Sequence, residues 1–178
     1  MVLTAFFVVC NGYAASPVDE VIDSGKKYLQ RYITDQAISE FTKAIQICPN
    51  DARGYSMRGI AYALRAKVRQ DLSDFDRAIP DLNKAIELNP LDYYAYATRA
   101  LAYNNKGDFD QGLSDYAKAI ELIRAHGLYY DRALFYFGKQ EYDKSWEYVR
   151  KAEVAGHNVH KQNPNFIKVL REKSGRQE

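Results

Sequence analysis

The sequence has 178 residues, of which 47% are apolar and 27% are charged, enough for one domain with a core or for one solenoid of small repeated units. Its formal net charge is only +2 and its basic residues are spread along the chain, which argues against nucleic acid or an anionic membrane as the main partner. Tyrosine occurs 15 times, and this rigid, amphipathic side chain serves both helix packing and contact surfaces.

The first fourteen residues differ from the rest of the chain. The segment from Val2 to Val9 is apolar and uncharged, and Gly12 and Ala14 place small residues where a signal peptidase prefers them. The segment is too short to span a bilayer, which needs roughly 20 apolar residues. We therefore expect residues 1–14 to be a signal peptide and the mature chain to be periplasmic or secreted. Because the leader lacks a positively charged start, a buried N-terminal segment of a cytoplasmic protein is the alternative.

The two cysteines bear on the same question. Cys10 follows Val9, whereas lipidation signals place a small residue before the cysteine, so we expect no lipid anchor. If cleavage follows Ala14, Cys48 is the single cysteine of the mature chain. One thiol cannot form an internal disulfide, and we expect Cys48 to be a buried structural cysteine.

Two short signatures alternate along the rest of the chain. The first places a small residue three positions before a tyrosine, in the pairs Gly25 and Tyr28, Gly59 and Tyr62, Ala100 and Tyr103, and Ala133 and Tyr136. The second follows each time, in the sets Ala37, Phe41 and Ala44; Ala78, Leu82 and Ala85; Gly112, Tyr116 and Ala119; and Ser145, Val149 and Ala152. Its members fall at i, i+4 and i+7, which is one stripe of a helix. Two alternating signatures predict two alternating helices that pack closely through their small residues.

These signatures, with Pro49 and Pro90 after the second one, resemble the tetratricopeptide repeat. The pattern of that family, about 34 residues long, carries Gly-x-x-Tyr on a first helix and Ala-x-x-x-Phe, Ala and Pro on a second. The segment NKAIELNP, ending at Pro90, is typical of the family, and the resemblance covers roughly residues 18 to 158. It implies an all-α fold, an α-solenoid of antiparallel helix hairpins in a right-handed superhelix, with a concave groove lined by the first helices.

We expect residues 15–178 to form a single domain. Its repeats are expected at about 18–51, 52–92, 93–125 and 126–159, followed by a capping helix at about 163–173. The second repeat is longer, because 41 residues separate Tyr62 from Tyr103 whereas 34 separate Tyr28 from Tyr62. The seven extra residues, at about 66–72, contain no Gly or Pro, so we expect them to lengthen both helices of the hairpin, with a flexible loop as the alternative.

Both ends have features of a solenoid terminus. Ser16, Pro17 and Asp19 are typical of an N-cap, a first-turn proline and an acidic third helical residue. The expected capping helix separates apolar from basic side chains, as required to cover the last apolar face of a stack.

No group of residues indicates catalysis or metal binding. His157 and His160 have no third ligand nearby, and the acidic residues lie mostly four positions from a Lys or Arg on solvent faces. The sequence has no Gly-rich phosphate loop and no nucleophile with an adjacent base. We therefore expect no catalytic residue, no metal and no cofactor, and predict that the protein is not an enzyme.

The resemblance implies which side chains line the groove. The expected groove residues are Lys26, Gln30, Arg53, Ile60, Tyr94, Leu101, Asn104, Asn105, Tyr130 and Phe137, with Ile22, Leu29, Ser56, Leu64 and Leu134 beside them. Some family members clamp a C-terminal carboxylate, but Ile60 and Leu101 are apolar where that clamp needs polar groups. An extended or helical partner with apolar side chains fits better. Packing between hairpins is the alternative for Tyr94 and Tyr130.

The predicted function is that of a non-enzymatic interaction module or scaffold that binds another protein or peptide in this groove. The alternative is a structural component of an envelope assembly that self-associates into a homo-oligomer. We expect neither a nucleic acid partner nor an integral membrane span.

Overall fold

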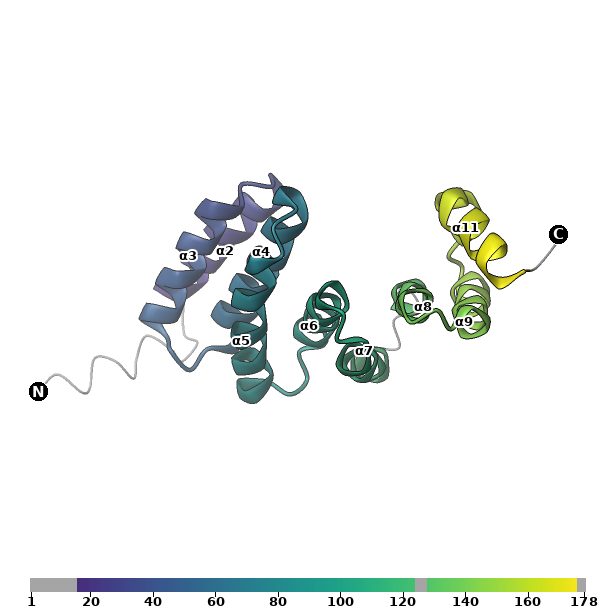
Figure 1. The fold of residues 1–178 in the computed structure, drawn as a ribbon. Coiled ribbons are helices and arrows are strands. Elements are labelled where there is room, and N and C mark those ends of the chain that lie inside the picture. Colours follow the sequence, from purple (N-terminus) through teal and green to yellow (C-terminus); the bar gives the residue numbers. More distant parts are fainter. Residues whose placement is uncertain (1–15, 124–127, 176–178) are drawn as a thin grey trace, which may run out of the picture.

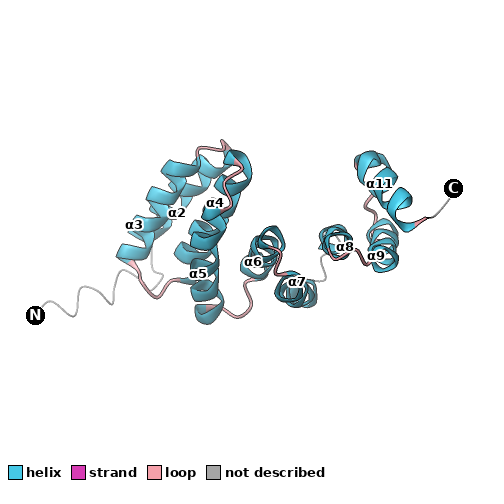
Figure 2. Ribbon diagram, in the orientation of Figure 1, coloured by secondary structure: helices cyan, strands magenta, loops and turns pink. Residues whose placement is uncertain are grey.

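The computed structural model describes residues 16–123 and 128–175, and in these ranges the chain forms helices and turns without strands (Figures 1 and 2). Four helix hairpins follow one another: α2 (Pro17–Gln30) with α3 (Thr34–Ile47), α4 (Ala52–Arg69) with α5 (Ser73–Leu88), α6 (Tyr93–Lys106) with α7 (Phe109–Ile123), and α8 (Leu128–Gly138) with α9 (Tyr142–Val154). A single turn, α10 (Val159–Gln162), leads to the final helix α11 (Pro164–Ser174).

The hairpins stack in chain order, so the molecule is a row of units (Figure 1). The expected all-α solenoid of antiparallel hairpins is confirmed. The first helices also contact one another, α2 with α4, α4 with α6 and α6 with α8. Successive second helices do not approach each other to the same extent in the described ranges. The first helices therefore form one continuous layer, which we call the inner layer.

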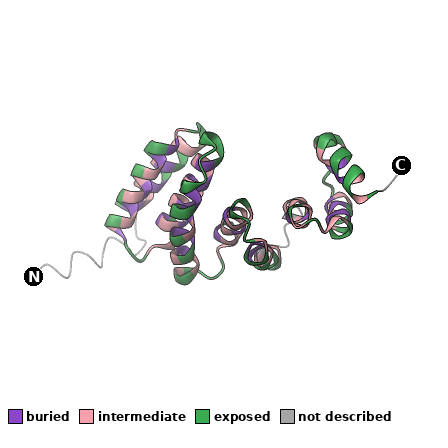
Figure 3. Ribbon diagram, viewed as in Figure 1, coloured by how far each residue is buried: buried purple, intermediate pink, exposed green. Residues whose placement is uncertain are grey.

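Small residues set the distance between the helices of a hairpin. A Cβ atom at Gly25 would lie 2.5 Å from Phe41 Cε1, and one at Gly59 would lie 2.7 Å from Leu82 Cγ. Both large side chains are fully buried, and Figure 3 shows buried residues gathered where paired helices face each other. Glycine is thus required here because the first helix lies directly on a large side chain of the second.

The seven extra residues lengthen the second hairpin. α4 has 18 residues and α5 has 16, whereas α2 and α3 have 14 each. α4 continues to Arg69 and ends at Gln70, which has a left-handed conformation with φ 55°. The predicted helical extension is therefore observed in place of a flexible loop, and it leaves Val68 and Leu72 56% exposed near the tip.

Both termini of the described stack carry closing structures. α2 begins with a capping box, in which Asp19 accepts a hydrogen bond from the Ser16 backbone N–H at 3.2 Å. At the other end α11 buries Ile167 and Leu170 in a cluster with residues of α8 and α9. The Trp146 indole N–H donates to Ser174 Oγ at 3.0 Å, which fastens α11 to α9.

Cys48 is fully buried at the end of α3, as expected. It is disulfide-bonded in the full chain, whereas the expectation of a lone thiol concerns a chain cleaved after Ala14. The other cysteine of the sequence, Cys10, lies outside the described residues, as do the predicted leader at 1–14 and the turn at 124–127.

Candidate partner-binding groove

The inner layer carries all of the predicted groove residues. Five of them are exposed, namely Lys26, Gln30, Arg53, Tyr94 and Asn105, and five are half-buried, namely Ile60, Leu101, Asn104, Tyr130 and Phe137. Ile22 and Ser56, counted beside them, are only 1% and 2% exposed. The expectation is wrong for these two, because Ile22 packs in the core of the first hairpin and Ser56 is enclosed within the stack.

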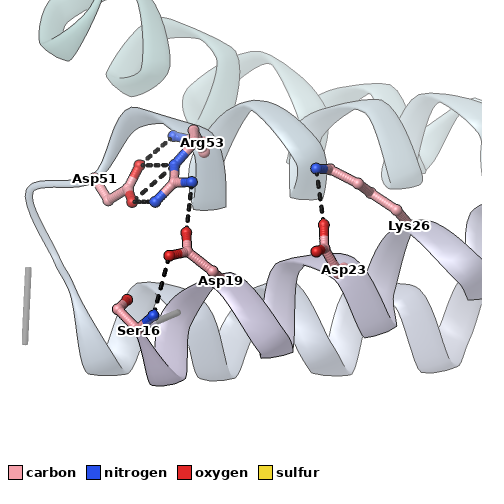
Figure 4. A network of polar contacts seen from close by, with 6 residues as sticks. All are labelled: Ser16, Asp19, Asp23, Lys26, Asp51 and Arg53. Atoms are coloured by element: carbon pink, nitrogen blue, oxygen red, sulfur yellow. Dashed lines mark hydrogen bonds and ion pairs between the residues drawn. The ribbon is translucent and has the colours of Figure 1, made fainter. Parts of the chain in front are cut away.

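The N-terminal end of the groove is an ion-pair network (Figure 4). Arg53 donates to Asp51 through Nε and Nη2, and its Nη1 donates to Asp19 of α2 at 2.7 Å. The hydrogen bond from Arg53 holds the pKa of Asp19 below its usual value. Lys26 is paired in turn with Asp23 at 3.1 Å. The cations at this end already have intramolecular partners, so a ligand would have to compete for them.

The middle of the groove is formed by α4 and α6. Tyr94 is 55% exposed, and its ring lies 3.9 Å from that of Tyr93, centroid to centroid. Asn105 Nδ2 donates to the Leu101 carbonyl one turn earlier at 2.8 Å, while Asn104 is half-buried. This stretch presents an aromatic ring, aliphatic carbon and amides without a strong charge.

The C-terminal end of the groove is covered by α11. The ring of Phe166 meets those of Tyr130 and Phe137 edge-on, at centroid distances of 5.6 and 5.4 Å. Both side chains therefore help to hold the final helix, which for Tyr130 agrees with the packing alternative. The part of the groove left open runs over α4 and α6.

Sequence reasoning missed the half-buried ion pairs that fasten the helices of a hairpin together, among them those of Arg58 and Arg99. Arg58 of α4 donates two hydrogen bonds to Asp81 of α5, at 2.7 and 2.8 Å. Arg99 of α6 donates two to Asp115 of α7, both at 2.7 Å. Such bidentate, charge-assisted pairs fix the geometry as well as adding stability. The sequence contains a signal for these ion pairs, because each of the two arginines directly precedes the small residue of the first signature.

Both arginines also reach the preceding hairpin. The third donor of Arg58 binds Thr42 Oγ1 of α3 at 3.2 Å, and that of Arg99 binds Asn83 Oδ1 of α5 at 2.6 Å. Each guanidinium thus joins three helices, two of its own hairpin and one of the hairpin before it. We refer to these two arrangements as arginine clips.

A second set of ion pairs joins successive hairpins on the exposed edge. An aspartate in the first turn of a second helix contacts a cation near the end of the next first helix, in the pairs Asp35 with Arg69, Asp76 with Lys106, and Asp110 with Lys139. In each of the last two pairs the aspartate raises the pKa of the lysine through a hydrogen bond. Because these groups are largely exposed, each pair adds little stability.

Two sequence models described as "Tetratricopeptide repeat" match the chain, one over residues 60–90 and the other over residues 82–114. The matched region runs from the middle of α4 to the first half of α7, and so covers parts of the second and third hairpins. The chain therefore contains tetratricopeptide repeats in this region. No curated protein matches its sequence.

Solved structures show the same architecture. A crystal structure of MamA is 26% identical, covers 76% of this chain and 76% of its own, and superimposes with a TM-score of 0.64. A thermophilic TPR protein from Thermus thermophilus covers 89% of this chain and 80% of its own, with a TM-score of 0.67. Its identity of 16% makes it a likeness of fold alone.

Tetratricopeptide repeat proteins are generally non-enzymatic modules for protein interaction, and a general role as an interaction scaffold follows for this chain. Within the described ranges, no group of three or more His, Cys, Asp or Glu side chains is placed to hold a metal ion. No helix in those ranges combines the length and the apolar character needed to cross a membrane.

Proposed function

We propose that this tetratricopeptide repeat protein binds a segment of another polypeptide on the middle of its inner layer, over α4 and α6. The observation that supports this placement is the difference between the middle and the ends of the groove. The ion pairs of Arg53 and Lys26 occupy one end and α11 covers the other, whereas Tyr94 stays 55% exposed between them. An aromatic anchor next to Leu101 and Asn104 suits an extended or helical segment with apolar side chains.

The groove is tested by affinity capture from an extract of the native host, with the bound proteins identified by mass spectrometry. The variant Tyr94→Ala/Asn104→Ala removes the aromatic anchor and one amide of the groove. Tyr32→Ala is the matched control, because Tyr32 is 68% exposed and lies in the turn after α2, outside the groove. Circular dichroism checks that both variants fold.

We expect the groove variant to lose its specific partner, with at least a tenfold fall in capture, corresponding to about 1.4 kcal/mol. The Tyr32 variant should capture the partner as the unmodified chain does. Equal capture by the folded groove variant would contradict the assignment of the groove.

We propose in addition that the protein is exported to the periplasm or secreted. The apolar segment from Val2 to Val9 supports this, and so do the small residues Gly12 and Ala14 that follow it. Cleavage after Ala14 would remove Cys10 and leave Cys48 as the single cysteine of the mature chain.

N-terminal sequencing and intact mass, each measured on protein from the native host, test the leader. Export with cleavage predicts a chain that begins at Ala15, with Cys48 reduced or bonded to a second molecule. Non-reducing electrophoresis separates those two states. A chain from the cytoplasm that still begins at residue 1 or 2 would contradict export.

Self-association is a second candidate function, favoured by the exposed Val68 and Leu72 at the tip of the lengthened hairpin. Exposed aliphatic side chains on a protruding tip can pair with a second copy. Analytical ultracentrifugation of the unmodified chain and of Val68→Ser/Leu72→Ser tests this. A concentration-dependent dimer that the double variant abolishes would support it, and a monomer at every concentration would contradict it.

A further inference from the structure

The fourth hairpin carries the same arginine as the two arginine clips. Arg132 directly precedes Ala133, as Arg58 precedes Gly59 and Arg99 precedes Ala100. By register it should bind an aspartate on its own second helix and a polar side chain on the helix before. Neither acceptor is present.

The aspartate of the clip is replaced by an aromatic residue. Asp115 lies 16 residues after Arg99, and the residue at the same distance from Arg132 is Tyr148. The guanidinium of Arg132 lies over this ring, with Cζ 4.7 Å from the centroid. This cation–π contact does not supply the carboxylate oxygens that accept the N–H groups of Arg58 and Arg99.

The acceptor on the preceding helix is also lost. Thr42 and Asn83 each follow the large buried residue of the second signature, and the residue at this point of α7, after Tyr116, is Ala117. A methyl group accepts no hydrogen bond. The third hairpin therefore offers Arg132 nothing in place of the two earlier acceptors.

The consequence is a buried donor without a partner. Arg132 Nε is buried and makes no hydrogen bond. A carboxylate close enough to feel the charge of Arg132, that of Glu147, is paired with Lys151 on its own helix, and no ion pair joins Glu147 or Asp131 to Arg132 in the described part of the chain. Buried donors are normally satisfied, so this one marks the Arg132 guanidinium as lacking the acceptors that the two clips supply.

An open cleft lies over α8 and α9, the two helices that carry Arg132 and Tyr148. It has a volume of about 620 Å³ and is lined by Tyr129, Glu147, Arg150, Lys151, Val154 and Ala155. Tyr129 precedes Arg132 by one helical turn on α8, and Lys151 follows Tyr148 by one turn on α9. The cleft thus combines the cation of Arg150, the Lys151–Glu147 ion pair and the apolar surface of Val154, which is 91% exposed.

We propose that this cleft on the fourth hairpin binds an acidic segment of a partner polypeptide, with an Asp or Glu side chain paired to Arg132. The partner's carboxylate accepts hydrogen bonds from the guanidinium, the role that Asp81 and Asp115 play in the clips. Arg150 favours a further negative charge in the same segment, and Val154 contacts an apolar neighbour. The site is separate from the groove over α4 and α6.

The test follows the arginine Nε–H signals by NMR in the ¹⁵N-labelled full chain. The probe is the blocked peptide acetyl-Ala-Asp-Val-amide, and acetyl-Ala-Asn-Val-amide is its uncharged match. Arg132→Lys assigns the Arg132 signal by removing it. We expect the Asp peptide to shift this signal saturably and the Asn peptide to bind at least about tenfold more weakly.

Arg58 and Arg99 are internal controls, since their donors are already occupied, and their signals should stay in place. The groove variant Tyr94→Ala/Asn104→Ala should respond to the peptide as the unmodified chain does. The proposal is overturned by an Arg132 signal that does not move, that moves equally with the Asn peptide, or that moves no more than those of Arg58 and Arg99.

A second variant tests the same geometry from within the chain. Tyr148→Asp restores the aspartate of the clip, so the Arg132 signal should move towards those of Arg58 and Arg99 without any peptide. The variant should then no longer respond to the Asp peptide. An undiminished response in this variant, if it is folded, would also overturn the proposal.

Discussion

Gly112 offers the sharpest test of the packing between the third and fourth hairpins. The equivalent residues of the other second helices are Ala37, Ala78 and Ser145, so the repeat pattern predicts that Gly112→Ala is harmless. In the structure a Cβ atom at this position would lie 2.5 Å from Phe135 Cζ and 3.0 Å from the carbonyl oxygen of Ala100. Glycine is present because Phe135 of the next hairpin occupies the space of the missing methyl group.

Two opposing terms decide the size of the effect. Alanine in place of glycine in a helix interior stabilises by about 1 kcal/mol. Overpacking a filled core costs about 1–3 kcal/mol. The upper part of that range applies, because Phe135 is fully buried and meets the rings of Tyr116 and Phe109 edge-on at 4.9 and 6.4 Å. We expect Gly112→Ala to lower the free energy of unfolding by about 2 kcal/mol.

Urea unfolding followed by far-ultraviolet circular dichroism measures this difference. Ser114→Ala is the control, since Ser114 is exposed on the same helix and should change stability by less than about 0.5 kcal/mol. Phe135→Leu opens space at the contact, so Gly112→Ala should cost less in that background, and a double-mutant cycle reports the coupling. If Gly112→Ala is as stable as the unmodified chain, or more stable, the argument from close packing is refuted.

Two further predictions concern charged groups. Asp115→Asn leaves the half-buried Arg99 without its carboxylate, so it should lower the free energy of unfolding by about 1–3 kcal/mol in urea melts. Asp76→Asn, in an exposed pair, should change the free energy of unfolding by less than about 1 kcal/mol. Equal effects of the two substitutions would contradict the role given to the arginine clips. Burial raises the pKa of Asp131 above 3.8, despite the opposing charges of Lys67 and His157. The folded state therefore binds this proton more tightly than the unfolded state does. As a result, the free energy of unfolding falls as the pH rises through the range between the unfolded and the folded pKa of Asp131. Asp131→Asn should therefore raise the melting temperature at pH 7 relative to the unmodified chain but not near pH 3.5, and a gain of equal size at both values would be inconsistent with this linkage.

The helix hairpins could be predicted from the sequence because their determinants are local. A small residue such as Gly59 and a large one such as Leu82 recur at fixed spacings, and those spacings leave one way for two helices to pack. The insert could be assigned to helix for the same reason, since it contains no residue that ends a helix before Gln70.

The state of the groove residues was harder to predict because it depends on neighbouring hairpins. Ile22 and Ser56 occupy groove positions by count, yet both are buried. Phe137 likewise lies on the expected face but contacts Phe166 of a helix outside the repeats. A repeat pattern records the contacts within one hairpin, whereas the contacts with the next hairpin depend on side chains that vary from repeat to repeat.

The exposed ion pairs between hairpins have a consequence for how the chain folds. Asp35 with Arg69, Asp76 with Lys106, and Asp110 with Lys139 join groups only 34, 30 and 29 residues apart. Closing each contact therefore requires about one repeat to become ordered, at a similar and modest loss of chain entropy. Folding can begin at any pair of neighbouring hairpins and extend towards both ends. A chain that emerges from the ribosome N-terminus first can thus build stable structure hairpin by hairpin, before its final helix has been synthesised.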